Sequence, residues 1–204
     1  ALLDPSVNTL QSKTYDGGTK AEGTLTLSST DGNPILSEDA VALEAKGTFT
    51  WTSKDAGTNT VNVTGIALDS KFEDRYELTT SELSNVSCSG AKIENAQIKN
   101  VSVRQMMELT YNGREQLPEV TATGSTIGGT AITFHYGLTA EQAADENEWL
   151  NYVPAFTDAG TYTVYYTASA VNHDSVYGSF EIKIKNASIT GVDAAGYTGI
   201  YDGQ

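Results

Sequence analysis

Short stretches in which apolar and polar residues alternate run along most of the chain. In residues 180–185 the even positions are Phe or Ile and the odd positions are Glu or Lys. In residues 161–167 Tyr162, Val164 and Tyr166 alternate mainly with threonines. This period of two is the pattern of a half-buried β-strand. Weaker alternations at residues 24–28, 41–45, 48–51, 61–68, 76–78, 107–111 and 132–136 predict further strands. An interruption of the pattern at Gly65 predicts a bulge or a turn there.

Residues 139–151 (TAEQAADENEWLN) break this alternation. They are rich in helix formers and contain no β-branched residue after Thr139. The hydroxyl of Thr139 can cap a first helical turn, and Gln142 follows at the capping-box position. We expect a short helix or helical turn here, with its acidic residues in solvent.

Three short sequences recur at domain-sized intervals. Tyr15-Asp16-Gly17 returns as Tyr111-Asn112-Gly113 and as Tyr201-Asp202-Gly203, Asp55-Ala56-Gly57-Thr58 returns as Asp158-Ala159-Gly160-Thr161, and Asn95-Ala96-Gln97-Ile98 returns as Asn186-Ala187-Ser188-Ile189. The first spacings within the three sets are 96, 103 and 91 positions, too long for a solenoid repeat. We therefore predict a domain at residues 1–95, a second at residues 96–187 and the start of a third at residues 188–204.

Composition fits two small domains that need no covalent or metal support. A repeat of about 90 residues can bury its own core. Cys88 is the only cysteine, so an intrachain disulfide is impossible. The repeats meet near residues 92–98 without a proline-rich or Gly/Ser-rich linker, which predicts a semi-rigid junction.

Charge and hydropathy exclude two classes of partner. The net charge is −14, from 26 acidic and 12 basic residues, so no basic patch is expected to meet the phosphates of nucleic acid. No run of 18 apolar residues occurs, so we expect no membrane insertion in this segment.

Catalytic machinery is sparse in the sequence. His135 and His173 are the only histidines, and neither is expected to meet a nucleophile and an acid in a triad. The acidic residues show no spacing that suggests a glycosidase pair. We predict no enzymatic activity, no catalytic residues and no cofactor.

The run Asp158-Ala159-Gly160-Thr161-Tyr162 points to a particular fold. An Asp-x-Gly-x-Tyr sequence before a strand is typical of the tyrosine corner of immunoglobulin-like sandwiches, where the Tyr hydroxyl bonds to the backbone a few residues upstream. We therefore assign structural roles to Asp158, Gly160 and Tyr162. The first repeat has Asn59 at the corner position, which weakens the corner there. The prediction is an all-β chain of two tandem immunoglobulin-like β-sandwich domains, the second with a short helical insert.

These motifs also resemble known repeats of bacterial surface proteins. Tyr15-Asp16-Gly17, the Asp-Ala-Gly-Thr sequence at residues 55–58 and the Val-Asn-Val-Thr-Gly-Ile sequence at residues 61–66 are similar to the YDG-type repeat. Tyr111-Asn112-Gly113, with residues 157–164, resembles the related MBG repeat. The resemblance implies an extracellular protein, secreted or on a Gram-positive cell wall, in which such units serve as stalk or adhesin modules. It implies no catalytic residues.

Two kinds of binding site stay open as alternatives. Trp149, Tyr152 and Tyr165 are weak candidates for stacking on a glycan or contacting a protein, although Trp149 could instead pin the insert to the sandwich. Asp31 with Asn33, or Asp145 with Glu146 and Glu148, could contribute to a Ca²⁺ site, but neither set has the spacing of a dedicated loop, and we predict no metal site.

Two functions follow from these predictions. The first is a non-catalytic structural spacer, the stalk of an adhesin, that is monomeric within a longer repeat array. The alternative is an adhesin module that binds a host or bacterial surface glycan or protein through the second domain.

Overall fold

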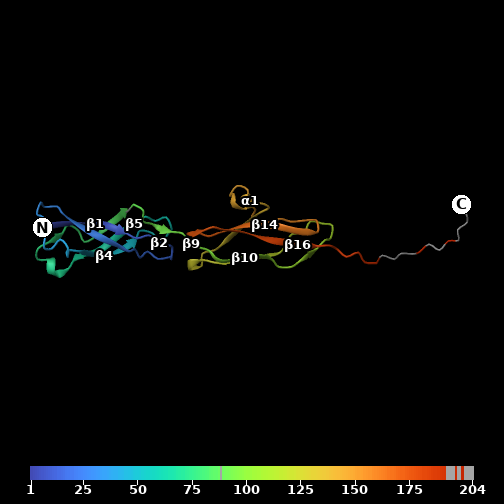
Figure 1. Ribbon diagram of the computed structural model, residues 1–204, viewed down its shortest axis with the longest axis horizontal. Helices are drawn as coiled ribbons and strands as arrows, with labels where there is room; N and C mark the ends of the chain where they lie inside the picture. Colours follow the sequence, from blue (N-terminus) through green and yellow to red (C-terminus); the bar gives the residue numbers. More distant parts are fainter. Residues whose placement is uncertain (88, 192–195, 197–198, 200–204) are drawn as a thin grey trace. The chain divides into compact units, whose positions relative to one another are not determined.

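In a computed structural model, described for residues 1–87, 89–191, 196 and 199, the chain consists mostly of β-strands and turns (Figure 1). The all-β prediction is confirmed. The chain divides into two compact units, the first made of residues 1–101, 123–134 and 168–176 and the second of residues 102–122, 135–167 and 177–204. The predicted domain boundaries at residues 95 and 187 remain predictions. Cys88 and the third Tyr-x-Gly sequence at residues 201–203 lie outside the described residues.

The first unit is built on two three-stranded sheets (Figure 1). One has the order β3-β1-β6, with β1 (Leu2–Leu10), β3 (Gly23–Ser29) and β6 (Glu77–Leu78). The other has the order β4-β5-β7, with β4 (Ala45–Trp51), β5 (Thr60–Leu68) and β7 (Leu83–Ser87). One core cluster includes Phe49, Trp51, Val61, Val63 and Ile66, and a second is formed by Leu3, Phe72 and Tyr76.

Separate two-stranded sheets accompany these, and two of them are short parallel pairs. β2 (Lys13–Thr14) pairs with β8 (Ile93–Glu94), and β9 (Ala96–Gln97) pairs with β15 (His173–Asp174). A further pair joins β10 (Lys99–Gln105) and β12 (Val120–Ser125), and two 3-10 turns, η1 (Ser70–Phe72) and η2 (Ile127–Gly129), link neighbouring elements.

The interruption predicted at Gly65 is confirmed as a bulge. Lys46 lies opposite Ala67, but two positions further on Thr48 lies opposite Thr64, so β5 has one extra residue. Gly65 has a backbone φ of +63°, a conformation that glycine adopts at no steric cost.

The strand expected at residues 41–45 is wrong for residues 41–44. Residues 38–42 form turns, and Val41 is 93% exposed. The cause is the buried carboxylate of Asp39, which accepts a hydrogen bond from the Tyr76 hydroxyl (2.8 Å) and pairs with Arg75 (3.0 Å). This long-range contact overrides the local alternation, and β4 begins only at Ala45.

The second unit contains a four-stranded sheet of order β11-β16-β14-β13. Its strands are β11 (Leu109–Thr110), β13 (Thr133–Gly137), β14 (Gly160–Ser169) and β16 (Val176–Lys185). Val164 and Tyr166 of β14 are buried, as are Phe180, Ile182 and Ile184 of β16, whereas Glu181, Lys183 and Lys185 are exposed. The faces of β16 are thus the predicted ones, whereas in β14 Thr167, expected on the polar face, is also buried.

The predicted insert contains the helix α1 (Ala140–Ala144), which lies beside β14 (Figure 1). Thr139 accepts a hydrogen bond from the Gln142 N–H (3.1 Å), and the Gln142 side chain accepts one from Leu138 N–H (2.8 Å). The Thr167 hydroxyl donates to the Ala143 carbonyl (2.6 Å), which ties α1 to β14. The helix is confirmed but spans only five residues, because Asp145 is extended.

Candidate functional site

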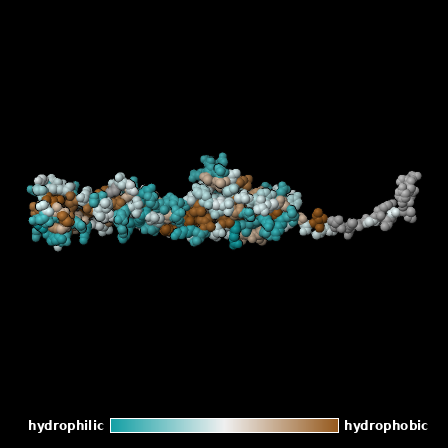
Figure 2. Space-filling model, viewed as in Figure 1, coloured by the Kyte–Doolittle hydropathy of each residue, from teal (hydrophilic) through white to brown (hydrophobic). Residues whose placement is uncertain are grey.

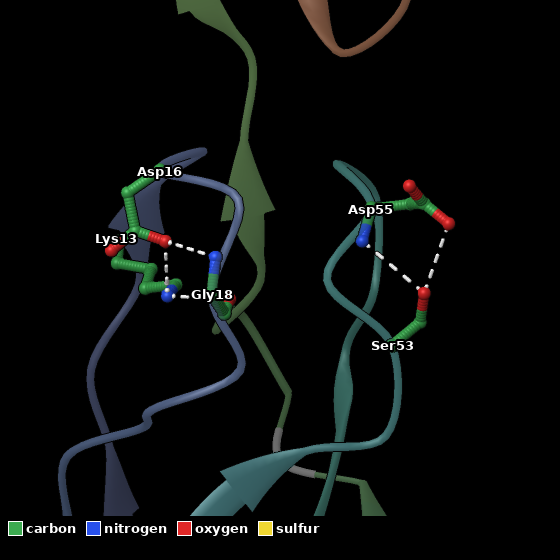
Figure 3. Close-up of polar contacts among 5 residues, drawn as sticks. All are labelled: Lys13, Asp16, Gly18, Ser53 and Asp55. Atoms are coloured by element: carbon green, nitrogen blue, oxygen red, sulfur yellow. Dashed lines mark hydrogen bonds and ion pairs between the residues drawn. The ribbon is translucent and has the colours of Figure 1, made fainter. Parts of the chain in front are cut away.

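The Tyr-x-Gly turn of the first unit is held by one carboxylate (Figure 3). Asp16 Oδ1 accepts hydrogen bonds from Lys13 Nζ (2.7 Å) and from Gly18 N–H (2.8 Å), and Lys13 Nζ also donates to the Gly18 carbonyl (2.8 Å). The Lys13 hydrogen bond, followed by the Gly18 N–H, lowers the pKa of Asp16 below its ordinary value. The aspartate of this motif therefore closes its own loop.

The Asp-Ala-Gly-Thr turn lies across β8 from the first turn (Figure 3). The Ser53 hydroxyl donates to Asp55 Oδ2 (3.0 Å) and accepts from Asp55 N–H (3.2 Å). Gly57, with a φ of +87°, donates its N–H to the Ile93 carbonyl (2.7 Å), while on the other side Tyr15 N–H donates to the Glu94 carbonyl (2.8 Å). Both turns are thus fixed to the same short strand.

Asn172, which belongs to the same unit, clamps the second turn. Its Nδ2 donates to Asp55 Oδ1 (3.0 Å), and its Oδ1 accepts from Ala56 N–H (3.0 Å). Asn172 has a φ of +63°, a region that Asn tolerates better than most side chains. The Asn172 hydrogen bond is the main reason that the pKa of Asp55 is lowered, with Ser53 next.

His173 is buried beside this clamp and has both ring nitrogens in hydrogen bonds. Its Nε2 accepts from Ile127 N–H (3.1 Å), and Nδ1 therefore carries the proton and donates to the Val171 carbonyl (2.8 Å). The centroid of its ring lies 5.6 Å from that of the Tyr15 ring, in a T-shaped arrangement. We call residues 15–18, 53–57 and 172–174 the turn network. Its polar groups bind one another and the backbone, which is a structural arrangement.

The residues of the predicted tyrosine corner lie together in the second unit. The Tyr162 hydroxyl donates to the Asp158 carbonyl (2.9 Å), and the Tyr162 ring stacks on Phe156 at 4.1 Å between centroids. Gly160 is the first residue of β14. A Cβ atom built on it would lie 3.6 Å from the Tyr162 ring, so a larger residue there would contact the ring. The Tyr162 hydroxyl is thus bonded to the backbone four residues upstream.

The three ligand candidates do not gather in one place. The Trp149 ring stacks on His135 at 3.7 Å, and His135 Nδ1–H donates to Asn151 Oδ1 (2.9 Å), so Trp149 packs the insert against the strand. Tyr152 is 62% exposed. Tyr165 is half-buried and lines a shallow hollow of about 530 Å³ with α1 and Tyr177.

Two residues of interest are missing from the sequence prediction. Tyr177 lines the hollow with Tyr165. The sequence feature that could have indicated it is a large aromatic residue among the polar, outward-facing positions of β16. Asn172 had no signal beyond a turn-forming sequence, since its partner Asp55 lies 117 positions away.

Two of the candidate metal ligands, Asp31 and Asp145, have their carboxylates in local hydrogen bonds. Asp31 accepts from Ser29 Oγ (3.1 Å), from Asn33 and from Leu2 N–H (2.9 Å), and the Asn33 side chain is the main reason that its pKa is lowered. Asp145 Oδ1 accepts from the N–H and Nδ2 of Asn147. Within the part of the chain that the structure describes, no three His, Cys, Asp or Glu residues are placed to share a metal ion.

The fold and the turn network place the chain in a class of β-rich domains. In this class the polar residues of the motifs hold turns in place. The family model of the YDG domain matches residues 3–83, and the YDG resemblance is thereby confirmed for the first repeat. No match to a curated protein was found. Across the described residues, no helix has the length and apolar character needed to cross a bilayer.

Proposed function

We propose that the chain is a non-catalytic spacer, a pair of tandem immunoglobulin-like domains from the stalk of a bacterial surface protein. The observation that carries this proposal is the turn network. A catalytic or binding motif would be sought among the side chains that recur between the repeats. These side chains instead fix loops to a strand and to one another. Function then lies in the stability and spacing of the domains.

Three findings support the finer parts of this proposal. The Tyr162 corner supports an immunoglobulin-like second domain related to MBG repeats. The YDG match at residues 3–83 supports the extracellular setting that the resemblance implies. The mostly hydrophilic residues on the face seen in Figure 2 suit a monomer within an array, because brown residues occur there only in small groups.

The spacer proposal is tested by scattering and by ligand screens. A compact globule of this length has a radius of gyration of about 17 Å. A spacer should exceed this value clearly in small-angle scattering and should bind nothing on a glycan array. A compact particle would contradict the proposal.

The hollow beside α1 favours a second candidate, an adhesin module. Tyr165, Tyr177 and Ala140 lie on its wall, and aromatic faces with neighbouring hydroxyls suit the faces of sugar rings. A glycan array should then give a hit that Tyr165→Ala and Tyr177→Ala abolish, while Tyr152→Ala, outside the hollow, leaves it intact. Trp149→Ala tests the remaining candidate in the same assay. An array without hits rejects glycan binding.

A further inference from the structure

We propose that one surface of the second unit, formed by Tyr111 and residues 186–189, binds the asparagine–histidine–aspartate turn of a further domain of this repeat type. The turn meant is one like Asn172-His173-Asp174 of the first unit. The inference rests on the proposed spacer function, since it assumes that such domains follow one another, and it adds the side chains that would join them.

The first unit contains the bound form of such a contact. The rings of His173 and Tyr15 pack against each other in a T-shaped arrangement. Ala96 N–H donates to the Asn172 carbonyl (2.9 Å), and Asn95 Nδ2 donates to Asp174 Oδ1 (3.0 Å). As a result Tyr15 is only 6% exposed and Ala96 is fully buried.

The second unit repeats the receiving side of this contact. Tyr111 N–H donates to the Lys185 carbonyl over 2.8 Å, the same distance as from Tyr15 N–H to the Glu94 carbonyl. The parallel pairing of Thr110 with Lys185 corresponds to that of Thr14 with Glu94. Asn186-Ala187 then follows Lys185, as Asn95-Ala96 follows Glu94.

The matching side chains of the second unit are uncovered. Tyr111 is 40% exposed, against 6% for Tyr15, and Ile189 is 87% exposed, against 5% for Ile98. An aromatic and an aliphatic residue are therefore in solvent at the positions where their equivalents are buried. The occupant that fits Tyr111 is the turn whose His173 ring packs against Tyr15.

One difference between the two units restricts the extent of the proposed binding surface. Gly57 has a φ of +87°, whereas Gly160 is not in the left-handed region and begins β14 directly. The Asp158 carbonyl is also used by the Tyr162 hydroxyl. The clamp that Asn172 forms on residues 55–56 therefore has no counterpart in the surface proposed, which is limited to Tyr111 and residues 186–189.

The test extends the chain by one repeat. A second copy of residues 99–185 is joined to Ile189, so that residues 186–189 precede it as residues 95–98 precede Lys99 in the parent chain. The copy carries Tyr111→Phe, so that only the original Tyr111 can be nitrated at this position. Nitration of Tyr111 in the original part is followed by mass spectrometry, and NMR relaxation reports whether the appended copy tumbles with the rest.

If the surface binds the turn, nitration of Tyr111 slows about sevenfold relative to the parent chain. This factor is the ratio of the exposed fractions of uncovered Tyr111 (40%) and covered Tyr15 (6%). His173→Ala in the appended copy should restore the parent rate, whereas Tyr152→Ala in that copy should not. The appended copy should also share the correlation time of the whole.

An unchanged nitration rate, or a folded appended copy that tumbles independently, would overturn the docking proposal and leave the spacer function standing. An appended copy that stays unfolded also counts against docking. The surface at Lys185 would then not bind a following turn, as the equivalent surface at Glu94 does. A glycan-array hit combined with slowed nitration would overturn the spacer function and leave docking intact.

Discussion

Asn172 shows how much a single side chain does in this fold. Its left-handed backbone directs the turn, and its amide makes both a donor and an acceptor bond to residues 55–56. Because one amide satisfies two partners, its removal leaves Ala56 N–H and one Asp55 oxygen to water alone.

We expect Asn172→Gly to lower the free energy of unfolding of the first unit by about 1–2 kcal/mol, the sum of two modest hydrogen bonds. Glycine can keep the left-handed backbone, so the loss of stability measures the contribution of the Asn172 side-chain amide. Urea denaturation gives the free energy, and hydrogen exchange should quicken at Ala56. Asn85→Gly is the matched control, since exposed Asn85 also has a positive φ, of 53°. Equal losses in the two variants would contradict the clamp.

Tyr162 is the second residue whose polar atom is expected to matter. Tyr162→Phe keeps the ring on Phe156 but removes the bond to the Asp158 carbonyl, and should cost about 1 kcal/mol in urea denaturation. Tyr177→Phe, at a 63% exposed position, should be close to neutral. If the two variants are equally stable, the corner contributes nothing.

At the scale of elements, β14 and β16 are fitted to each other by a glycine under an aromatic ring. A Cβ atom on Gly178 of β16 would lie 2.4 Å from the Tyr166 hydroxyl and 2.5 Å from its ring carbon Cζ. Tyr166 is 9% exposed, so its ring has little room to move. The pair therefore favours one register of the two strands.

Gly178→Ala should accordingly destabilise the second unit by about 1–3 kcal/mol, the usual cost of overpacking. Thermal and urea denaturation measure it. Ser179→Ala introduces the same residue at the next, exposed position and should change stability by less than about 0.5 kcal/mol. A Gly178→Ala chain as stable as this control would show that the ring moves aside freely.

For the whole molecule, several carboxylates make stability depend on pH. Asp16 and Asp55 have lowered pKa values through hydrogen bonds, chiefly from Lys13 and Asn172, and Glu108 through Lys185. The folded chain thus binds fewer protons than the unfolded chain near and below the ordinary pKa values of 3.8 and 4.5. This contribution to stability is present above those values and is lost as pH falls through the lowered ones.

We therefore expect the urea midpoint to fall steadily as the pH is lowered below about 4.5. Asp55→Asn should flatten this dependence, because the group that it removes no longer titrates. Glu146→Gln, which removes a carboxylate at an exposed position outside the turn network, is the control and should leave the slope unchanged. A midpoint that is constant or rises on acidification would contradict the role of these bonds.

The sequence could predict what depends on local pattern. The faces of β16 and the inward face of β14 follow from alternation, the cap of α1 from Thr139 and Gln142, and the bulge from Gly65. It could not predict what depends on distant partners. Val41 was placed in a strand because nothing nearby shows that Asp39 would be buried by Tyr76 and Arg75.

The candidate site followed the same rule. Tyr162 and its partner Asp158 are four positions apart, so the motif contains both. Asn172 and Asp55 are 117 positions apart, and only the fold brings them together. Tyr165 was named without Tyr177, because neither strand alone shows that the two rings share a hollow.

The parallel pairs β2·β8 and β11·β16 have a mechanical consequence. Each joins a strand near the start of a repeat to a strand near its end. Tension applied through the two ends would pull such strands past each other, which loads bonds such as Lys13 N–H to the Lys92 carbonyl and Tyr15 N–H to the Glu94 carbonyl at the same time. A hairpin pulled open from one end loses its bonds one by one. This closure instead makes them yield together, as a tether under flow or shear would require.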